Sequence, residues 1–257
     1  MEICTDVIQS YLQGKIPMTN SWFYAYTNGV TSIATTRQEV CARLLEECEN
    51  YRDFPLWNHD LITALFMDYD NWLREVVLLP IVGSHPNFDA AVIEHKGKFF
   101  LLIDLLNIAD YTQSVKEMCY ILHNLCHIHL LRYLFLQRFP KPTQSLSLLN
   151  YRFFCEGFLL YLAWNEDITS YVFHTPAYHS IKQKSFQHLY QALLMEETKR
   201  KQLLQVLNHV DLWDRFPDIA GMFFCDDVFQ RQGTDGLRTY FSFGWQDSAN
   251  RLFPDLN

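Results

Sequence analysis

The sequence predicts an α+β fold that is mostly helical and carries a small antiparallel sheet ahead of one long helix. Apolar residues make up 49% of the 257 positions, beside only nine glycines and nine prolines, which is typical of a folded, helix-rich protein. Apolar residues recur at helical spacing through most of the chain. A single stretch, residues 90–104, instead follows the pattern of a β-hairpin.

The first part of the chain, residues 1–75, is predicted to be a helical N-terminal region. Apolar residues fall near one helical face in residues 36–51 and again in residues 58–77. The pattern changes at Val76, where a short, continuous apolar run predicts a buried strand over residues 77–82 that ends at Gly83. The change of pattern indicates a second region, residues 76–257.

The hairpin and the helices after it follow from turn and capping residues. Residues 90–95 and 98–104 are the two predicted strands, and Lys96-Gly97 forms the turn. A long helix follows, which Thr112 or Ser114 can cap and which Pro140 ends. After a proline-broken loop, we expect helical segments at residues 148–164, 179–212 and 217–232, with Gly233 as the final stop.

Charge and cysteine content limit the class of protein. The chain has 21 basic and 29 acidic residues and no basic run, which disfavours nucleic acid as a partner. No apolar stretch reaches the roughly 18 residues of a membrane span. Seven irregularly spaced cysteines and a first segment without signal-peptide character predict a cytoplasmic protein. Export by a route without an N-terminal signal stays open.

Two histidines in the long predicted helix are candidate metal ligands. His123 and His127 are four residues apart, so their side chains lie within about 40° of each other around a helix. Ten histidines in a chain of 257 would produce roughly 0.4 such pairs by chance, so the pair alone is weak evidence. Its surroundings strengthen it, because buried imidazoles in an apolar helix need a partner for each ring nitrogen. Zinc accepts such nitrogen ligands.

A carboxylate in a later helix is the candidate third ligand. Glu156 is the only charged residue in the apolar stretch 153–163, and a lone buried carboxylate is costly unless it is paired or bound to metal. Gly157 follows it inside the same predicted helix, at a cost of about 1 kcal/mol relative to alanine. This glycine indicates that another segment packs closely against the backbone.

These residues resemble the gluzincin metallopeptidases of the thermolysin-like clan, particularly the peptidase-MA-like group. In that group His-Glu-x-x-His precedes a helix reading Glu-Gly-x-Ala-x-Tyr, and Glu156, Gly157 and Tyr161 match the second motif. Residues 223–238 are similar to the group's helix that ends in a Tyr-Gly-x-x-x-Leu turn. The resemblance covers residues 76–240 in element order. It implies a zincin-like domain over residues 76–257.

The resemblance also implies a metal and a partner. It places Zn²⁺ on His123, His127 and Glu156, and it places a protein or peptide ligand in a cleft beside the β-hairpin. One departure changes the expected chemistry: Asn124 occupies the position of the catalytic glutamate. That glutamate transfers a proton between the metal-bound water and the leaving amine, and an amide cannot do so. Because such groups contribute about 10² to 10⁴ in rate, we expect weak or absent peptide hydrolysis.

No nearby residue replaces this base. Glu117 and His129 each lie about 240° around the helix from His123, away from the metal-facing side. Three hypotheses therefore follow: a zinc-binding pseudo-peptidase that binds protein or peptide, an active zinc hydrolase that uses substrate or another base, and a metal-free helical interaction protein. The acidic pair Asp226-Asp227 is interpreted as a solvated helix face, since adjacent helical positions diverge by about 100°.

Overall fold

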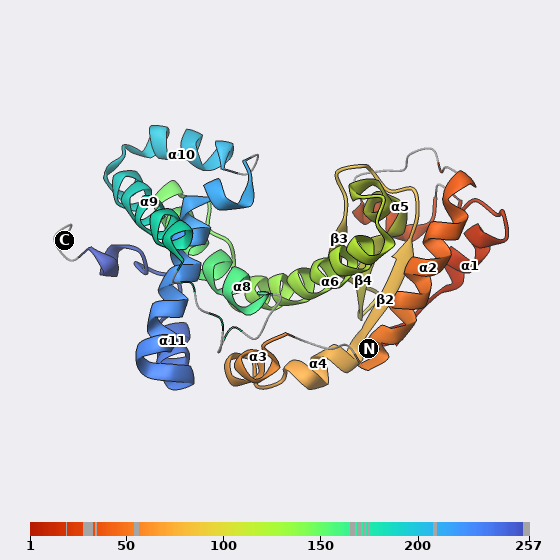
Figure 1. The fold of residues 1–257 in the computed structure, drawn as a ribbon, viewed down its shortest axis with the longest axis horizontal. Coiled ribbons are helices and arrows are strands. Elements are labelled where there is room, and N and C mark those ends of the chain that lie inside the picture. The colour runs from red at the N-terminus through yellow and green to blue at the C-terminus, as the bar shows by residue number, and fades with distance from the viewer. Residues whose placement is uncertain are drawn as a thin grey trace. The chain divides into compact units, whose positions relative to one another are not determined.

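The structure is a computed structural model that divides into two units, each made of two stretches of chain (Figure 1). It describes all residues except 19, 28–32, 34, 54–56, 165–167, 169–170, 172, 174, 208–209 and 254–257. Unit 1 comprises Met1–Leu56 and Met67–Tyr133, and unit 2 comprises Trp57–Phe66 and Leu134–Asn257. These boundaries are drawn by contacts in space, whereas the predicted boundary at residue 75 follows the local sequence pattern.

Unit 1 contains a four-stranded sheet whose strand order is β1-β2-β4-β3. The strands are β1 (Glu2–Ile3), β2 (Val76–Ile81), β3 (Ala90–His95) and β4 (Lys98–Asp104). β2 pairs in parallel with both β1 and β4, and only β3 is antiparallel to its neighbour. The α+β class is confirmed, but the sheet is mixed rather than antiparallel. Among the described strands, β3 and β4 pair locally as a hairpin, whereas the two parallel pairings join segments farther apart in the sequence.

The predicted hairpin is confirmed, including its turn. His95 and Lys98 are paired across a two-residue loop. Lys96 has φ 52° and Gly97 has φ 73°, and two successive positive φ values define the type I′ turn that matches the twist of a hairpin. The predicted buried strand is also confirmed, because all six residues of β2 are buried. A strand buried on both faces needs a continuous apolar run rather than alternation.

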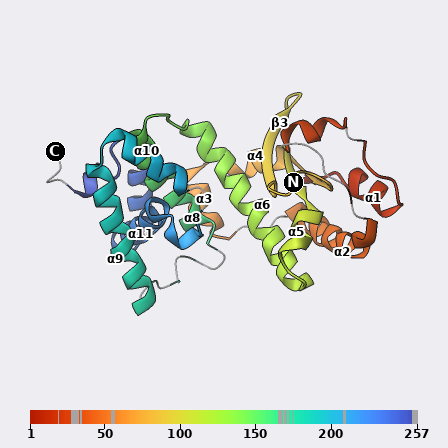
Figure 2. The same ribbon diagram turned by 90° about the horizontal axis from the view of Figure 1, so that it is seen from above.

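Four short helices accompany this sheet: α1 (Asp6–Leu12), α2 (Gln38–Glu49), α4 (Tyr69–Glu75) and α5 (Leu105–Tyr111). The first three contact β2, and α2 also contacts α5 (Figure 2). Asp104 ends β4 and caps α5, since its Oδ1 accepts hydrogen bonds from the backbone N–H groups of Leu106 and Asn107. The expected helix over residues 58–77 is two helices, interrupted at residues 66–68.

The long helix α6 (Val115–Arg138) forms where the sequence predicts it. The Ser114 hydroxyl accepts a hydrogen bond from the Glu117 backbone N–H at 3.4 Å, and Pro140 follows the last turn. The residues of α6 through Tyr133 belong to unit 1. There Tyr133 stacks on Trp72 of α4 at a centroid distance of 5.6 Å and meets Phe99 of β4 edge-on. These ring contacts attach α6 to the rest of unit 1.

The regular secondary structure of unit 2, over its described residues, is helical. Its helices are α3 (His59–Leu65), α7 (Ser145–Tyr151), a π-helical turn (Arg152–Glu156), α8 (Gly157–Leu162), α9 (Pro176–Leu194), α10 (Glu197–Val206) and α11 (Phe216–Phe243). The predicted helix at 148–164 is thus confirmed, with a π-helical turn inside it. The segment 179–212 contains two helices separated at residues 195–196, and residues 208–209 lie outside the described part. Gly233 interrupts α11 with φ 62°, after which the helix resumes.

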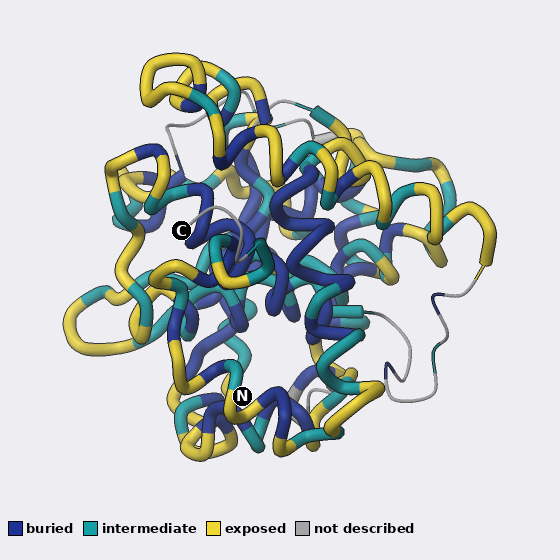
Figure 3. Tube along the Cα trace, turned by 90° about the vertical axis from the view of Figure 1, so that its left-hand side faces the viewer, coloured by how far each residue is buried: buried dark blue, intermediate teal, exposed yellow. Residues whose placement is uncertain are grey.

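The core of unit 2 includes one very close helix contact. A Cβ placed on Gly157 would lie 2.5 Å from the Cα of Gly221 in α11, and one placed on Gly221 would lie 1.8 Å from the Phe153 carbonyl oxygen. The close approach predicted from Gly157 is confirmed. Buried residues of both units are drawn in dark blue in Figure 3. Over the described residues, no helix has both the length and the apolar character that a bilayer crossing requires.

Candidate metal centre

Helix α6 presents His123 and His127 from the same side, one turn apart. Both residues belong to unit 1. His127 is completely buried and His123 is half-buried. Their ring centroids are 6.4 Å apart, and the ring planes are inclined by 70°. The helical spacing therefore brings the two imidazoles to one face, as the sequence predicts.

The separation of the rings bears on whether they can share an ion. Two imidazoles on one zinc, with Zn–N distances of about 2.0–2.1 Å and a tetrahedral angle, place their centroids roughly 5 Å apart. The observed separation is wider. One of the side chains would have to rotate for both nitrogens to meet the same tetrahedral ion.

Burial makes both imidazoles neutral at physiological pH. Burial, together with the charge of neighbouring His123, lowers the pKa of His127 from 6.5 to about 3. Burial also lowers the pKa of His123. Because a metal binds the deprotonated imidazole nitrogen, both side chains are already in the form that a metal requires.

Tyr51 and two cysteines near this helix face are neutral, and the carboxylate of Glu47 is within electrostatic reach of Tyr51 and Cys48. The ring of Tyr51 meets His123 edge-on at 5.7 Å, and burial raises the pKa of the Tyr51 hydroxyl. Burial likewise raises the pKa of the thiols of Cys48 and Cys126, which are both fully buried. Metal-binding cysteines are thiolates, so a metal that bound either thiol would first have to displace its proton.

Asn124, at the position of the missing base, is half-buried. Its Oδ1 is shielded from solvent, and no hydrogen-bond donor among the described residues reaches it. A buried acceptor without a donor costs free energy of about 1–3 kcal/mol. Asn124 thus offers a ligand or a water an acceptor, but it offers no titratable group.

Glu156, the predicted third ligand, lies in unit 2 at the end of the π-helical turn. π-Helical turns inside α-helices are rare and are frequent at functional sites. The side chain of Glu156 is half-buried, although its neighbours Cys155 and Gly157 are buried. That Glu156 binds the same metal ion as the two histidines of unit 1 stays a prediction from the sequence.

A buried ion pair stands beside Glu156 in unit 2. Arg152, which begins the π-helical turn, donates to Asp218 of α11 from Nε at 2.7 Å and from Nη2 at 2.6 Å. Arg152 is 7% exposed and Asp218 is 3% exposed. Burial raises the pKa of Asp218, the Arg152 guanidinium opposes this rise, and the charge of Glu156 adds to it. Glu156 is thus within electrostatic reach of the pair.

Sequence reasoning overlooked this ion pair, although a signal for it exists. Arg152 and Asp218 are single charges in otherwise apolar stretches, as Glu156 is, and each such charge needs a partner. The interpretation of Asp226-Asp227 as a solvated face is wrong. Asp226 is 4% exposed, and Asp227 accepts a hydrogen bond from Lys182 Nζ at 2.5 Å. Adjacent side chains on a helix do point in directions about 100° apart, but that of Asp226 points into the interior of unit 2.

Neither the geometry of the described residues nor the likeness to known proteins adds independent support for a metal centre. In the part of the chain that the structure describes, no group of three or more His, Cys, Asp or Glu residues is arranged to hold a metal ion. Comparisons of the chain with known protein families, with curated proteins and with solved structures find no match. The gluzincin resemblance therefore rests on the motif residues alone.

Proposed function

We propose that this chain is a zincin-like pseudo-peptidase that holds Zn²⁺ on His123, His127 and Glu156 and binds a protein or peptide. One observation carries the proposal: two neutral imidazoles, one buried and one half-buried, lie one turn apart on α6, with Asn124 between them. Neutral imidazoles are ready nitrogen donors for zinc, so the chemistry of the donor set fits this metal.

Asn124 determines what the proposed centre does. Bound zinc would polarise a carbonyl or a water, which is the chemistry that the metal supplies. The buried Oδ1 of Asn124 can accept a hydrogen bond from a bound group, since no described donor occupies it. It cannot accept the proton of an attacking water, and binding without hydrolysis is the consequence.

The proposed peptide partner would use the edge of the sheet. β3 is at one end of the strand order, and its pairing is with β4 alone. An extended peptide can add to such an edge through backbone hydrogen bonds. Hydrogen exchange at the backbone amides of Ala90–His95 should slow when an unstructured peptide binds. Unchanged exchange in β3 at saturating peptide would contradict this part of the proposal.

Metal content tests the proposal most directly. Purified protein should contain close to one zinc per chain, and the double variant His123→Ala/His127→Ala should contain none. His59→Ala is the matched control, because His59 is a partly exposed helix histidine outside the proposed centre. Glu156→Gln should weaken zinc binding in a competition with a chelator, whereas exposed Glu196→Gln should not. A metal-free wild type after growth in zinc would overturn the proposal.

Restoring the base tests the assignment of Asn124. Asn124→Glu should produce hydrolysis of an unstructured protein substrate, at least about 10² above the wild type, and a chelator should abolish it. The triple variant that also carries His123→Ala and His127→Ala should remain inactive. Brisk, chelator-sensitive hydrolysis by the unaltered chain would instead establish an active zinc hydrolase.

The 6.4 Å separation of the rings favours a second candidate function, a metal-free helical protein that acts by binding a partner. In this case the two histidines are ordinary buried side chains of α6. Zinc analysis separates the candidates, because only the pseudo-peptidase needs the metal.

A further inference from the structure

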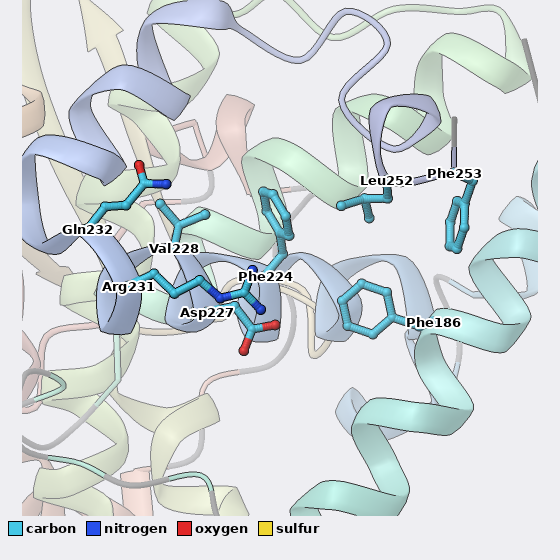
Figure 4. A pocket seen from close by; sticks show the side chains of 8 residues that line it. All are labelled: Phe186, Phe224, Asp227, Val228, Arg231, Gln232, Leu252 and Phe253. Atoms are coloured by element: carbon cyan, nitrogen blue, oxygen red, sulfur yellow. The ribbon is translucent and has the colours of Figure 1, made fainter. Parts of the chain in front are cut away.

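A cavity of about 360 Å³ lies in unit 2 between α9, α11 and the segment after α11 (Figure 4). This volume is at the lower end of the range for small-molecule sites. All its lining residues belong to unit 2, and none is in the candidate metal centre.

One wall of the cavity is apolar and firmly backed. Phe186 of α9, Phe224 of α11, and Leu252 and Phe253 of the C-terminal segment line it. All four are partly exposed, and all four pack against the buried core of unit 2. Phe224 also contacts Tyr240 at a centroid distance of 4.8 Å, and Phe253 contacts Tyr190 at 5.1 Å. The wall is therefore a preformed apolar surface.

The opposite end of the cavity is polar and carries an exposed cation, Arg231. Asp227, Arg231 and Gln232 line this end, and in Figure 4 the Arg231 guanidinium is directed toward Asp227. Lys182 already neutralises Asp227 through their ion pair. Among the described residues, no carboxylate is within 4.0 Å of the Arg231 guanidinium. The positive charge of Arg231 therefore stands at the solvent-exposed mouth of the apolar cavity, without an ion-pair partner among the described residues.

We propose that this cavity binds an apolar monocarboxylate. The carboxylate would pair with Arg231, whose planar guanidinium can donate two parallel hydrogen bonds, and the Gln232 amide is a further donor. The hydrocarbon or aromatic part would cover Phe186, Phe224, Leu252 and Phe253, and so remove apolar surface from water. An amine would instead be repelled by the positive charge of Arg231.

Titration calorimetry with 3-phenylpropionate tests the proposal. The buffer contains a chelator, so that a metal ion cannot be the partner of the carboxylate. Wild type should bind one equivalent saturably, and 3-phenylpropanol and 3-phenylpropylamine should bind at least tenfold more weakly. Arg231→Gln should weaken binding of the acid at least tenfold, while Lys199→Gln, an exposed cation on α10, should not. Phe224→Leu should also weaken binding while leaving the preference for the acid over the alcohol.

The outcomes decide between supporting and rejecting the site. Equal binding of acid and alcohol, equal binding by wild type and Arg231→Gln, or no saturable binding would each overturn the proposal. An apolar carboxylate could be a free acid or the C-terminal residue of a peptide, and N-acetyl-phenylalanine distinguishes these two ligands. Binding tighter than that of 3-phenylpropionate would assign the C-terminal residue of a peptide, and weaker binding would assign a free apolar acid. Neither result depends on zinc, so the fate of the metal proposal stays separate.

Discussion

Two buried sites, one in each unit, accommodate ionisable side chains in opposite ways. In unit 1, α6 buries His127 completely, and the burial keeps the ring neutral by lowering its pKa to about 3. In unit 2, Arg152 and Asp218 are nearly as buried, but they form an ion pair. Two hydrogen bonds from the Arg152 guanidinium to the Asp218 carboxylate hold the two opposite charges together. Removing a proton avoids the cost of a buried charge, whereas pairing offsets that cost.

This difference predicts different sensitivities. The neutral side chain of unit 1 makes stability depend on pH, since acid favours the unfolded state in which the imidazole can be charged. The paired side chains of unit 2 make stability depend on both partners being present, since either alone would be an uncompensated charge. The following predictions test the comparison, beginning with the largest expected effect.

Breaking the ion pair of unit 2 should have the largest effect. Asp218→Ala leaves the buried Arg152 guanidinium without its partner and should lower the free energy of unfolding by about 3–5 kcal/mol, measured by urea denaturation. Replacing both partners, as Arg152→Met with Asp218→Leu, should lower the free energy of unfolding by clearly less than Asp218→Ala does. Asp214→Ala is the control, because its pair with Lys184 is well exposed and should contribute no more than about 1 kcal/mol. A double variant as unstable as the single one would refute the pairing argument.

The close contact between Gly157 and Gly221 should have the next largest effect. Gly157→Ala gains roughly 1 kcal/mol of helix propensity, but its new Cβ would overlap backbone atoms of α11 that cannot move independently. The overlap should dominate, with a net loss of about 1–3 kcal/mol in the same urea measurement. Gly14→Asn, where a Cβ meets nothing within 4 Å and the side chain tolerates a positive φ, should change stability little. A stabilised Gly157→Ala protein would show that the helices separate easily.

The buried His127 of unit 1 should appear as a pH dependence of the metal-free protein. Its folded-state pKa, about 3, is below the unfolded value of 6.5, so the unfolded state binds more protons between these values. Stability should therefore fall as pH falls from about 6.5 toward 3, at up to about 1.4 kcal/mol per pH unit from this residue. His127→Leu, in the presence of a chelator, should have a flatter profile between pH 6.5 and 5. Parallel profiles for the two proteins would contradict burial of a neutral ring.

Local features of the fold could be predicted from the sequence because neighbouring residues specify them. Lys96-Gly97 can adopt the two positive φ values of a hairpin turn, and Gly233 can interrupt a helix. The helical spacing of His123 and His127 likewise follows from the sequence, because it is a property of the helix itself. The orientation of the two rings depends on the side chains packed around them, and spacing does not predict it.

The pairing of segments that are distant in the sequence was decided by the tertiary structure. β1 pairs with β2 across more than 70 residues and makes the sheet mixed, although each strand is too short to indicate its partner. The Asn58 amide donates to the carbonyls of Leu162 and Trp164 and so attaches α3 to unit 2, while α4, next along the chain, belongs to unit 1. Arg152 and Asp218 are 66 residues apart. The sequence by itself determined local conformation, through backbone sterics and periodicity; only the folded chain determined which distant charges and strands meet, because many alternative pairings are locally equivalent.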